Sequence, residues 1–236
     1  MLARRCIYGV LLGVLVGLGT SCGERRRETD ALWGVLEPPE ALHRISERAE
    51  DVILATADDN WPRVYRYIRD ISDAWVDYQR PTVVPVITPR PPATLMHDQL
   101  GAALARLKDA AANRHAAEAM RAANDIDAAA VDLFEYYHPT IPPDLHRMRV
   151  LQRRIMLDAA EGRLEGLPTT LTRARSAWAR ARPAVAIRTS ANVVTTFEGN
   201  LAAQQTALHE GNSEALATYY YNATSAPSDT GLCFPT

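Results

Sequence analysis

The sequence predicts an all-α protein built as an internally duplicated antiparallel helical bundle. Apolar residues recur at intervals of three and four along most of the chain, which is the spacing that one buried face of a helix requires. No segment alternates apolar and polar residues clearly enough to predict a β-strand. In addition, residues 39–83 match a later part of the chain when the sequence is displaced by 103 positions. These three observations predict the fold class.

The internal match includes identical residues as well as corresponding apolar positions. It continues, after a slip of one residue, to the end of the segment. The identical pairs include His43 with His146, Trp75 with Trp178, and Pro81 with Pro183. Because an internal repeat determines the architecture of a chain, we expect about eight helices in two four-helix units, residues 38–140 and residues 141–226.

Two helices are expected at the start of the first unit. The first begins at Pro39-Glu40, because a proline and an acidic residue both favour a helix start. The turn Asp58-Asp59-Asn60 separates it from the second helix, whose aromatic residues recur on one face. Prolines are frequent from Pro81 to Pro92, so this segment is expected to be an extended crossover.

Two further helices complete the first unit. Thr94 is a candidate N-cap for the third helix, and Asn113 marks the turn to the fourth. The fourth helix ends at His138-Pro139. It carries Asp125 and Asp127, and we expect both on a solvated face.

The second unit repeats this plan in a shorter form. Its first helix opens at Pro142-Pro143-Asp144 and turns at Glu161-Gly162, and its second helix ends at Pro183. The third helix follows almost at once. Gly211-Asn212-Ser213 stops it and caps a short fourth helix that bears Leu216.

Short turns between helices predict the topology of both units. They make neighbouring helices antiparallel, so each unit is expected to be an up-down bundle. A single fused array and a superhelical hairpin repeat are the alternatives. Residues 227–236 are expected to form an irregular tail.

The N-terminal residues have the pattern of an export signal. Arg4 and Arg5 precede an apolar segment, residues 7–18. The uncharged run that contains it is shorter than the roughly 18 apolar residues that a membrane-spanning helix needs. Small residues follow and lead directly to Cys22. This arrangement resembles the signal peptide and lipobox of bacterial lipoproteins, and an uncleaved anchor helix is the alternative.

The resemblance implies that residues 1–21 are removed and that the thiol of Cys22 receives lipid. Residues 22–37 would then form a tether, and the folded part would lie outside the cytoplasm, attached to the cell membrane or the outer membrane. Once Cys6 is removed and Cys22 is lipidated, Cys233 alone remains, so no intramolecular disulfide is expected.

Composition and motifs exclude several classes of function. The formal net charge is −2, with acidic and basic residues mixed, which argues against a nucleic-acid-binding protein. The chain has no Cys-x-x-Cys-His, His-Glu-x-x-His, phosphate-binding glycine loop or nucleophile elbow, so we do not expect an enzyme. The leading interpretation is a membrane-anchored binding module of the cell envelope. Its partner would be another envelope protein, a ligand or a second copy of the chain.

A metal or cofactor site is the alternative function. In an up-down unit, the first and third helices begin at the end where the fourth helix finishes. His43, His97 and His138 would gather at this end, together with Glu40 and Glu135. Imidazole and carboxylate ligands in this combination suit iron, zinc or copper. The competing explanation is that these side chains only cap helix ends and interact with helix dipoles.

Two other features have simpler explanations than a binding site. Trp75 and Trp178 fit a ligand platform, but their helical spacing from other apolar residues predicts that they are core anchors. His115-Ala-Ala-Glu118 is similar to the His-x-x-Glu of imelysin-like periplasmic helical proteins, and it is expected at the opposite end of the first unit from His43.

Overall fold

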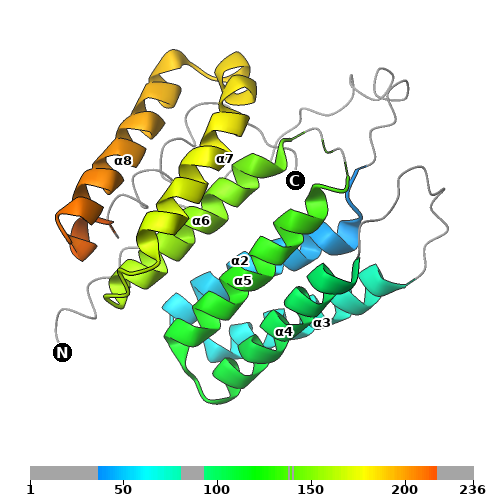
Figure 1. The fold of residues 1–236 in the computed structure, drawn as a ribbon. Helices are drawn as coiled ribbons and strands as arrows, with labels where there is room; N and C mark the ends of the chain where they lie inside the picture. The colour runs from blue at the N-terminus through cyan, green and yellow to red at the C-terminus, as the bar shows by residue number, and fades with distance from the viewer. Residues whose placement is uncertain (1–36, 81–92, 138, 140, 217–236) are drawn as a thin grey trace, which may run out of the picture. The chain divides into compact units, whose positions relative to one another are not determined.

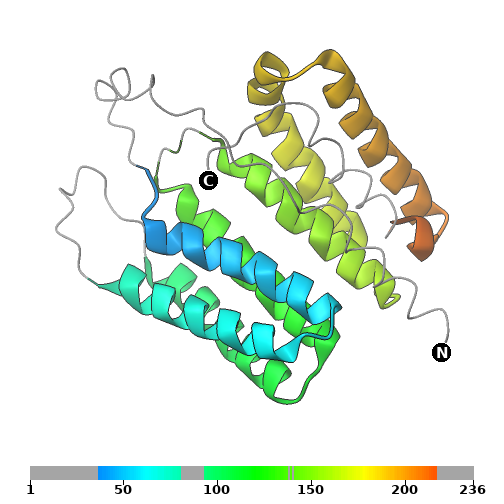
Figure 2. The same cartoon turned by 180° about the vertical axis from the view of Figure 1, so that it is seen from behind.

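The computed structural model describes residues 37–80, 93–137, 139 and 141–216, without the side chains of residues 93–97 and 188. Within these ranges all regular secondary structure is helical, so the prediction of an all-α fold is confirmed. The chain divides into two compact units, one up to Thr140 and one from Ile141 (Figures 1 and 2). The predicted signal segment, most of the tether, the crossover and the C-terminal tail lie outside the described residues.

In its described residues, unit 1 contains the helices α2 (Glu40–Ala57), α3 (Trp61–Gln79), α4 (Ala93–Ala112) and α5 (Ala116–Phe134). α2 packs against α3 on one side and against α5 on the other. α4 packs against α5 and has a smaller contact with α3. Helices joined by short turns run antiparallel, so unit 1 is an up-down bundle (Figure 1).

The helices of unit 1 form because their apolar residues recur on one side. α2 buries Ile45, Ala49 and Val52, which are spaced three or four residues apart. α3 begins where the side chain of Asn60 accepts a hydrogen bond from the backbone N–H of Arg63 at 3.3 Å. This cap satisfies one of the backbone donors that the first turn leaves without a partner inside the helix.

α5 departs from the expected pattern because polar residues are buried along it. Asn124 and Asp127 are 2% and 0% exposed, so the expectation of a solvated face is wrong for Asp127. Asp127 accepts a hydrogen bond from the hydroxyl of Ser46 on α2 at 2.6 Å, which helps to satisfy the buried carboxylate. Asp125 is half-buried and pairs with Arg106 of α4 at 3.1 Å.

In its described residues, unit 2 contains α6 (Pro143–Ala160), α7 (Leu167–Arg188) and α8 (Ala191–His209), and α7 packs against both α6 and α8. A further helical turn begins after α8. Asn212 accepts a hydrogen bond from the backbone N–H of Ala215 at 3.0 Å, and Leu216 is buried. This agrees with the cap expected at Asn212.

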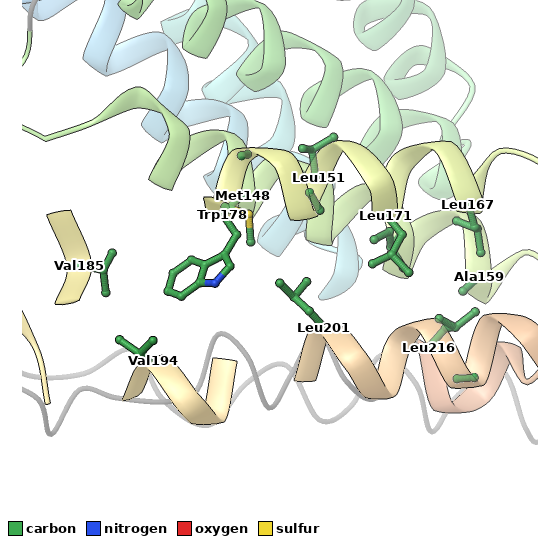
Figure 3. Packing of buried hydrophobic residues seen from close by; sticks show 14 residues of the cluster. Met148, Leu151, Ala159, Leu167, Leu171, Trp178, Val185, Val194, Leu201 and Leu216 are labelled. Atoms are coloured by element: carbon green, nitrogen blue, oxygen red, sulfur yellow. The ribbon is translucent and has the colours of Figure 1, made fainter. Parts of the chain in front are cut away.

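The core of unit 2 is built from all three helices and Leu216 (Figure 3). The indole of Trp178 on α7 is directed toward the helix that carries Val194 and Leu201. Trp178 is 7% exposed and its ring centroid lies 4.4 Å from that of Phe197 on α8. Trp178 is therefore a core residue, as expected.

α7 continues through Pro183, although the sequence predicted that the helix ends there. A proline inside a helix removes one backbone hydrogen bond, here to the carbonyl of Ala179. Both residues are exposed, so the hydrogen bond is lost on the solvent side of the helix. The turns after Pro183 also bury Val185 in the core of unit 2, and this burial offsets the cost of the proline.

Four helices, α2, α4, α6 and α8, end in the same backbone motif. The second residue past each helix has a positive φ, and the residue after it donates its N–H to the carbonyl five positions earlier, at 2.8 Å in each case. The positive-φ residues are Asp59, Arg114, Gly162 and Gly211, with φ of 55°, 53°, 70° and 67°. Two of the four are not glycine, so unit 1 carries backbone strain that unit 2 avoids.

Several features recur with the predicted displacement. The bounds of α6 lie 103 residues after those of α2, and the positive-φ residue Gly162 lies 103 residues after Asp59. Ile45 and Met148, which the displacement pairs, are both buried. A duplication would produce such correspondences, and the duplication itself stays a prediction.

Candidate functional site

One end of unit 1 brings together the start of α2 and the end of α5, as the sequence predicted. The ring of His43 on α2 lies 5.0 Å from the ring of Phe134 on α5, measured between centroids, with an angle of 38° between the planes. His43 is exposed and Phe134 is buried. The histidine therefore covers the edge of the core and remains accessible to a partner.

Aromatic side chains from the end of α3 lie at the same end of unit 1. Trp75 and Tyr78 stack with their ring centroids 5.8 Å apart, and both are 8% exposed. The hydroxyl oxygens of Tyr78 and Tyr137 lie 3.4 Å apart, and Tyr137 is half-buried. Tyrosine combines an apolar ring with a hydrogen-bonding tip, so this edge can contact both apolar and polar groups.

An ionic cluster lies beside these rings, between α2 and α3. Arg44 donates from Nη2 to the carboxylate of Asp77 at 2.8 Å, and Arg80 lies 3.1 Å from the other oxygen of that carboxylate. The side chains of Arg44 and Asp77 are 39% and 41% exposed. We call this end of unit 1 the aromatic–arginine patch, and define it by His43, Arg44, Asp77, Tyr78, Phe134 and Tyr137.

The predicted metal ligands are only partly within the described residues. His43, Glu40 and Glu135 are exposed at this end of unit 1. His97 belongs to α4, but its side chain lies outside the described part of the chain, as does His138 altogether. Among the side chains that the structure describes, no group of three or more His, Cys, Asp or Glu is arranged to hold a metal ion. The metal site stays a prediction.

His115 and Glu118 lie at the start of α5, at the opposite end from His43. Nδ1 of His115 is 3.3 Å from Oε2 of Glu118, and the side chains are 60% and 62% exposed. An ion pair with this exposure contributes little to stability. It is a local contact within one turn and is not joined to the aromatic–arginine patch.

In unit 2, Asp144 connects the start of α6 to the second half of α7. Arg180 donates to Asp144 from Nε at 3.0 Å and from Nη2 at 2.7 Å, and Arg147 adds a third hydrogen bond at 3.0 Å. Partial burial raises the pKa of Asp144, but the hydrogen bonds from Arg180 and Arg147 outweigh it, and the net effect lowers the pKa.

A second carboxylate, Glu198 on α8, pairs with another arginine on the other side of α7. Arg182 donates from Nε to Oε1 of Glu198 at 2.7 Å, and the indole N–H of Trp178 donates to the same oxygen at 3.3 Å. These hydrogen bonds, the one from Arg182 first, lower the pKa of Glu198. The arginines of α7 thus join it to α6 on one side and to α8 on the other. Sequence reasoning missed both contacts, because each joins residues on different helices.

Comparison with known proteins adds no relative, because no family model, curated protein or solved structure matches this chain. None of the described helices is long and apolar enough to span a membrane.

Proposed function

We propose that this chain is an extracytoplasmic lipoprotein that is anchored through Cys22 and acts as a binding module of the cell envelope. The apolar N-terminal segment and the small residues before Cys22 support the anchor. In this proposal the lipid attaches the chain to the cell membrane or the outer membrane, and the helical units bind a second component.

The aromatic–arginine patch is the observation that supports a binding role most directly. Protein interfaces are enriched in tyrosine, tryptophan, phenylalanine and arginine, and a few such residues supply most of the binding energy. The patch contains tyrosine, phenylalanine and arginine, and lies at the end of unit 1 where the chain enters α2 from residues 37–39. Arg44 and Tyr137 are partly exposed there, and His43 is exposed. We therefore propose that an envelope protein binds there.

The anchor is tested by acyl-chain labelling of cells that express the chain. Cys22→Ser should abolish labelling and leave the precursor unprocessed, because lipid transfer requires the thiol. Normal processing of the Cys22→Ser variant would contradict the lipoprotein assignment.

The binding role is tested with a photoreactive residue placed at His43 in cells. The control is the same residue at Glu118, which is also exposed but lies at the other end of unit 1. We expect a cross-linked partner from position 43 and none from position 118. An adduct with twice the mass of the chain would identify a second copy as the partner. Equal cross-linking from both positions, or none from position 43, would contradict a role for the patch.

A metal-binding function is the second candidate, because the contact between His43 and Phe134 brings together two of the three helix ends that it requires. The ligands would be His43, His97 and His138, with Glu40 and Glu135, and the metal would be iron, zinc or copper. Elemental analysis of protein purified without a metal-affinity tag tests this. Unchanged metal content after His43→Ala combined with His138→Ala would rule the site out.

A further inference from the structure

We propose that the last turns of α7 dock on a membrane surface that carries anionic phospholipid headgroups. The proposal rests on the proposed anchor, which would hold unit 2 close to such a surface. It concerns a surface that we call the basic–apolar end of α7, defined by Arg180, Arg182, Pro183, Ala186 and Ile187.

The first observation is that the charged residues of α7 are all basic. The helix carries five arginines and no aspartate or glutamate. At its basic–apolar end, the side chains of Arg180 and Arg182 are 56% and 51% exposed, and each also pairs with one carboxylate, Asp144 for Arg180 and Glu198 for Arg182. Juxtamembrane arginines bind anionic headgroups through such charge complementarity, and the attraction acts within about a Debye length of the surface.

The second observation is an apolar side chain beside these arginines. Ile187 is 85% exposed, against 51% for Val76 and 41% for Tyr65, the other exposed large hydrophobic residues of the described chain. It lies seven residues after Arg180, which is close to two helical turns, so both belong to one stripe along α7. Pro183 and Ala186 are exposed as well. Transfer of this apolar group from water into the headgroup region is favourable.

The guanidinium of Arg182 has further N–H donors that can bind phosphate oxygens. A guanidinium has five N–H donors, and among the described residues Arg182 uses only Nε, toward Glu198. Its terminal nitrogens can then bind a phosphate in the forked geometry that arginine favours.

A lipid surface fits this combination better than an acidic protein. An isolated protruding isoleucine needs a matching pocket on a protein, whereas the headgroup region accepts it without one. Long arginine side chains reach the headgroups while their apolar stems stay with the isoleucine.

The test measures binding of residues 23–236 to vesicles of phosphatidylcholine with and without phosphatidylglycerol, by co-sedimentation. Both described cores consist of residues from 38 to 216, so this protein keeps them. It carries no acyl chain, so its result is independent of the Cys22 experiment. We expect binding only to the anionic vesicles, weakening as salt is added.

Two variants and two matched controls locate the surface. Arg182→Gln should weaken binding about fivefold, and Ile187→Ser about tenfold. Arg163→Gln removes an arginine of similar exposure at the other end of unit 2, and Val76→Ser removes an exposed apolar side chain of unit 1. Both controls should bind as the parent protein does.

Three results would overturn the proposal. Equal binding to neutral and anionic vesicles would remove the role of charge. Equal losses in the controls would show that α7 is not the surface. Binding to soluble polyglutamate as tight as binding to anionic vesicles would indicate an acidic protein partner instead.

Discussion

Gln152 and Gln204 form a closed pair of hydrogen bonds in the core of unit 2. Each side-chain amide donates to the carbonyl oxygen of the other, at 3.1 Å and 2.6 Å, and the residues are 3% and 0% exposed. The pair joins α6 to α8, so it constrains how these two helices align along their length. Because a buried amide without partners is costly, other alignments of α6 and α8 are disfavoured.

Removal of one member of this pair should lower the free energy of unfolding more than removal of both members does. Gln152→Leu leaves the amide of Gln204 buried without its partner, so the free energy of unfolding should fall by about 1–3 kcal/mol. The double variant Gln152→Leu, Gln204→Leu removes both polar groups and should recover part of the loss. Urea denaturation measures both effects. Losses that simply add in the double variant would show that the two amides are not coupled.

Strain at Arg114 predicts a stabilising substitution. Its φ of 53° is unfavourable for a residue with a Cβ atom, so Arg114→Gly should raise the free energy of unfolding by about 1 kcal/mol. Arg114→Ala is the matched control and should give no such gain, because alanine has the same strain. Gly162→Ala should destabilise unit 2 by a similar amount, since φ is 70° there and no neighbouring atom lies within 4 Å of the added methyl group. Thermal denaturation of the three variants distinguishes backbone strain from loss of the Arg114 side chain.

Trp75 and Trp178 should be equally important for their own units. Both are buried, so each change to alanine should lower the free energy of unfolding by ~3–5 kcal/mol. The more conservative Trp178→Phe keeps most of the packing and loses the hydrogen bond to half-exposed Glu198, so it should cost much less. Measured losses below about 1 kcal/mol for Trp75→Ala would contradict its role as a core anchor.

The lowered pKa of Asp144 predicts a loss of stability in acid. In the unfolded chain an aspartate titrates near its ordinary pKa of about 3.9, whereas the folded pKa is lower. The stabilisation is therefore present above about pH 4 and disappears as the pH falls through the folded pKa. The difference in free energy of unfolding between the parent protein and Asp144→Asn should shrink over this range. Arg180→Gln should reduce the same pH dependence, and a difference that does not change with pH would contradict the assignment.

Only part of the aromatic–arginine patch was predictable from the sequence. His43 and the end of the fourth helix were expected at one end of unit 1 and lie there, because helix periodicity and short turns determine the direction of each helix. The helix itself ends at Phe134, earlier than the expected His138-Pro139. The pairing of Arg44 with Asp77 was not visible, because it joins residues 33 positions apart on different helices. The ring contact between Phe134 and His43 was missed because these residues also lie on different helices, far apart in the sequence.

The sequence by itself determined the features that depend on neighbouring residues. The helix-start signal at Pro142-Pro143, the cap at Asn212 and the buried stripe of α2 all act within one or two turns, so their physical basis lies in local backbone geometry and spacing. The tertiary structure decided which polar groups are buried and what they contact. Asp127 was expected in solvent, but it accepts a hydrogen bond from Ser46, 81 residues away. Pro183 was expected to end a helix, but the burial of Val185 beyond it offsets the lost hydrogen bond. In both cases burial changes the free energy of a group, and burial depends on helices that only packing brings together.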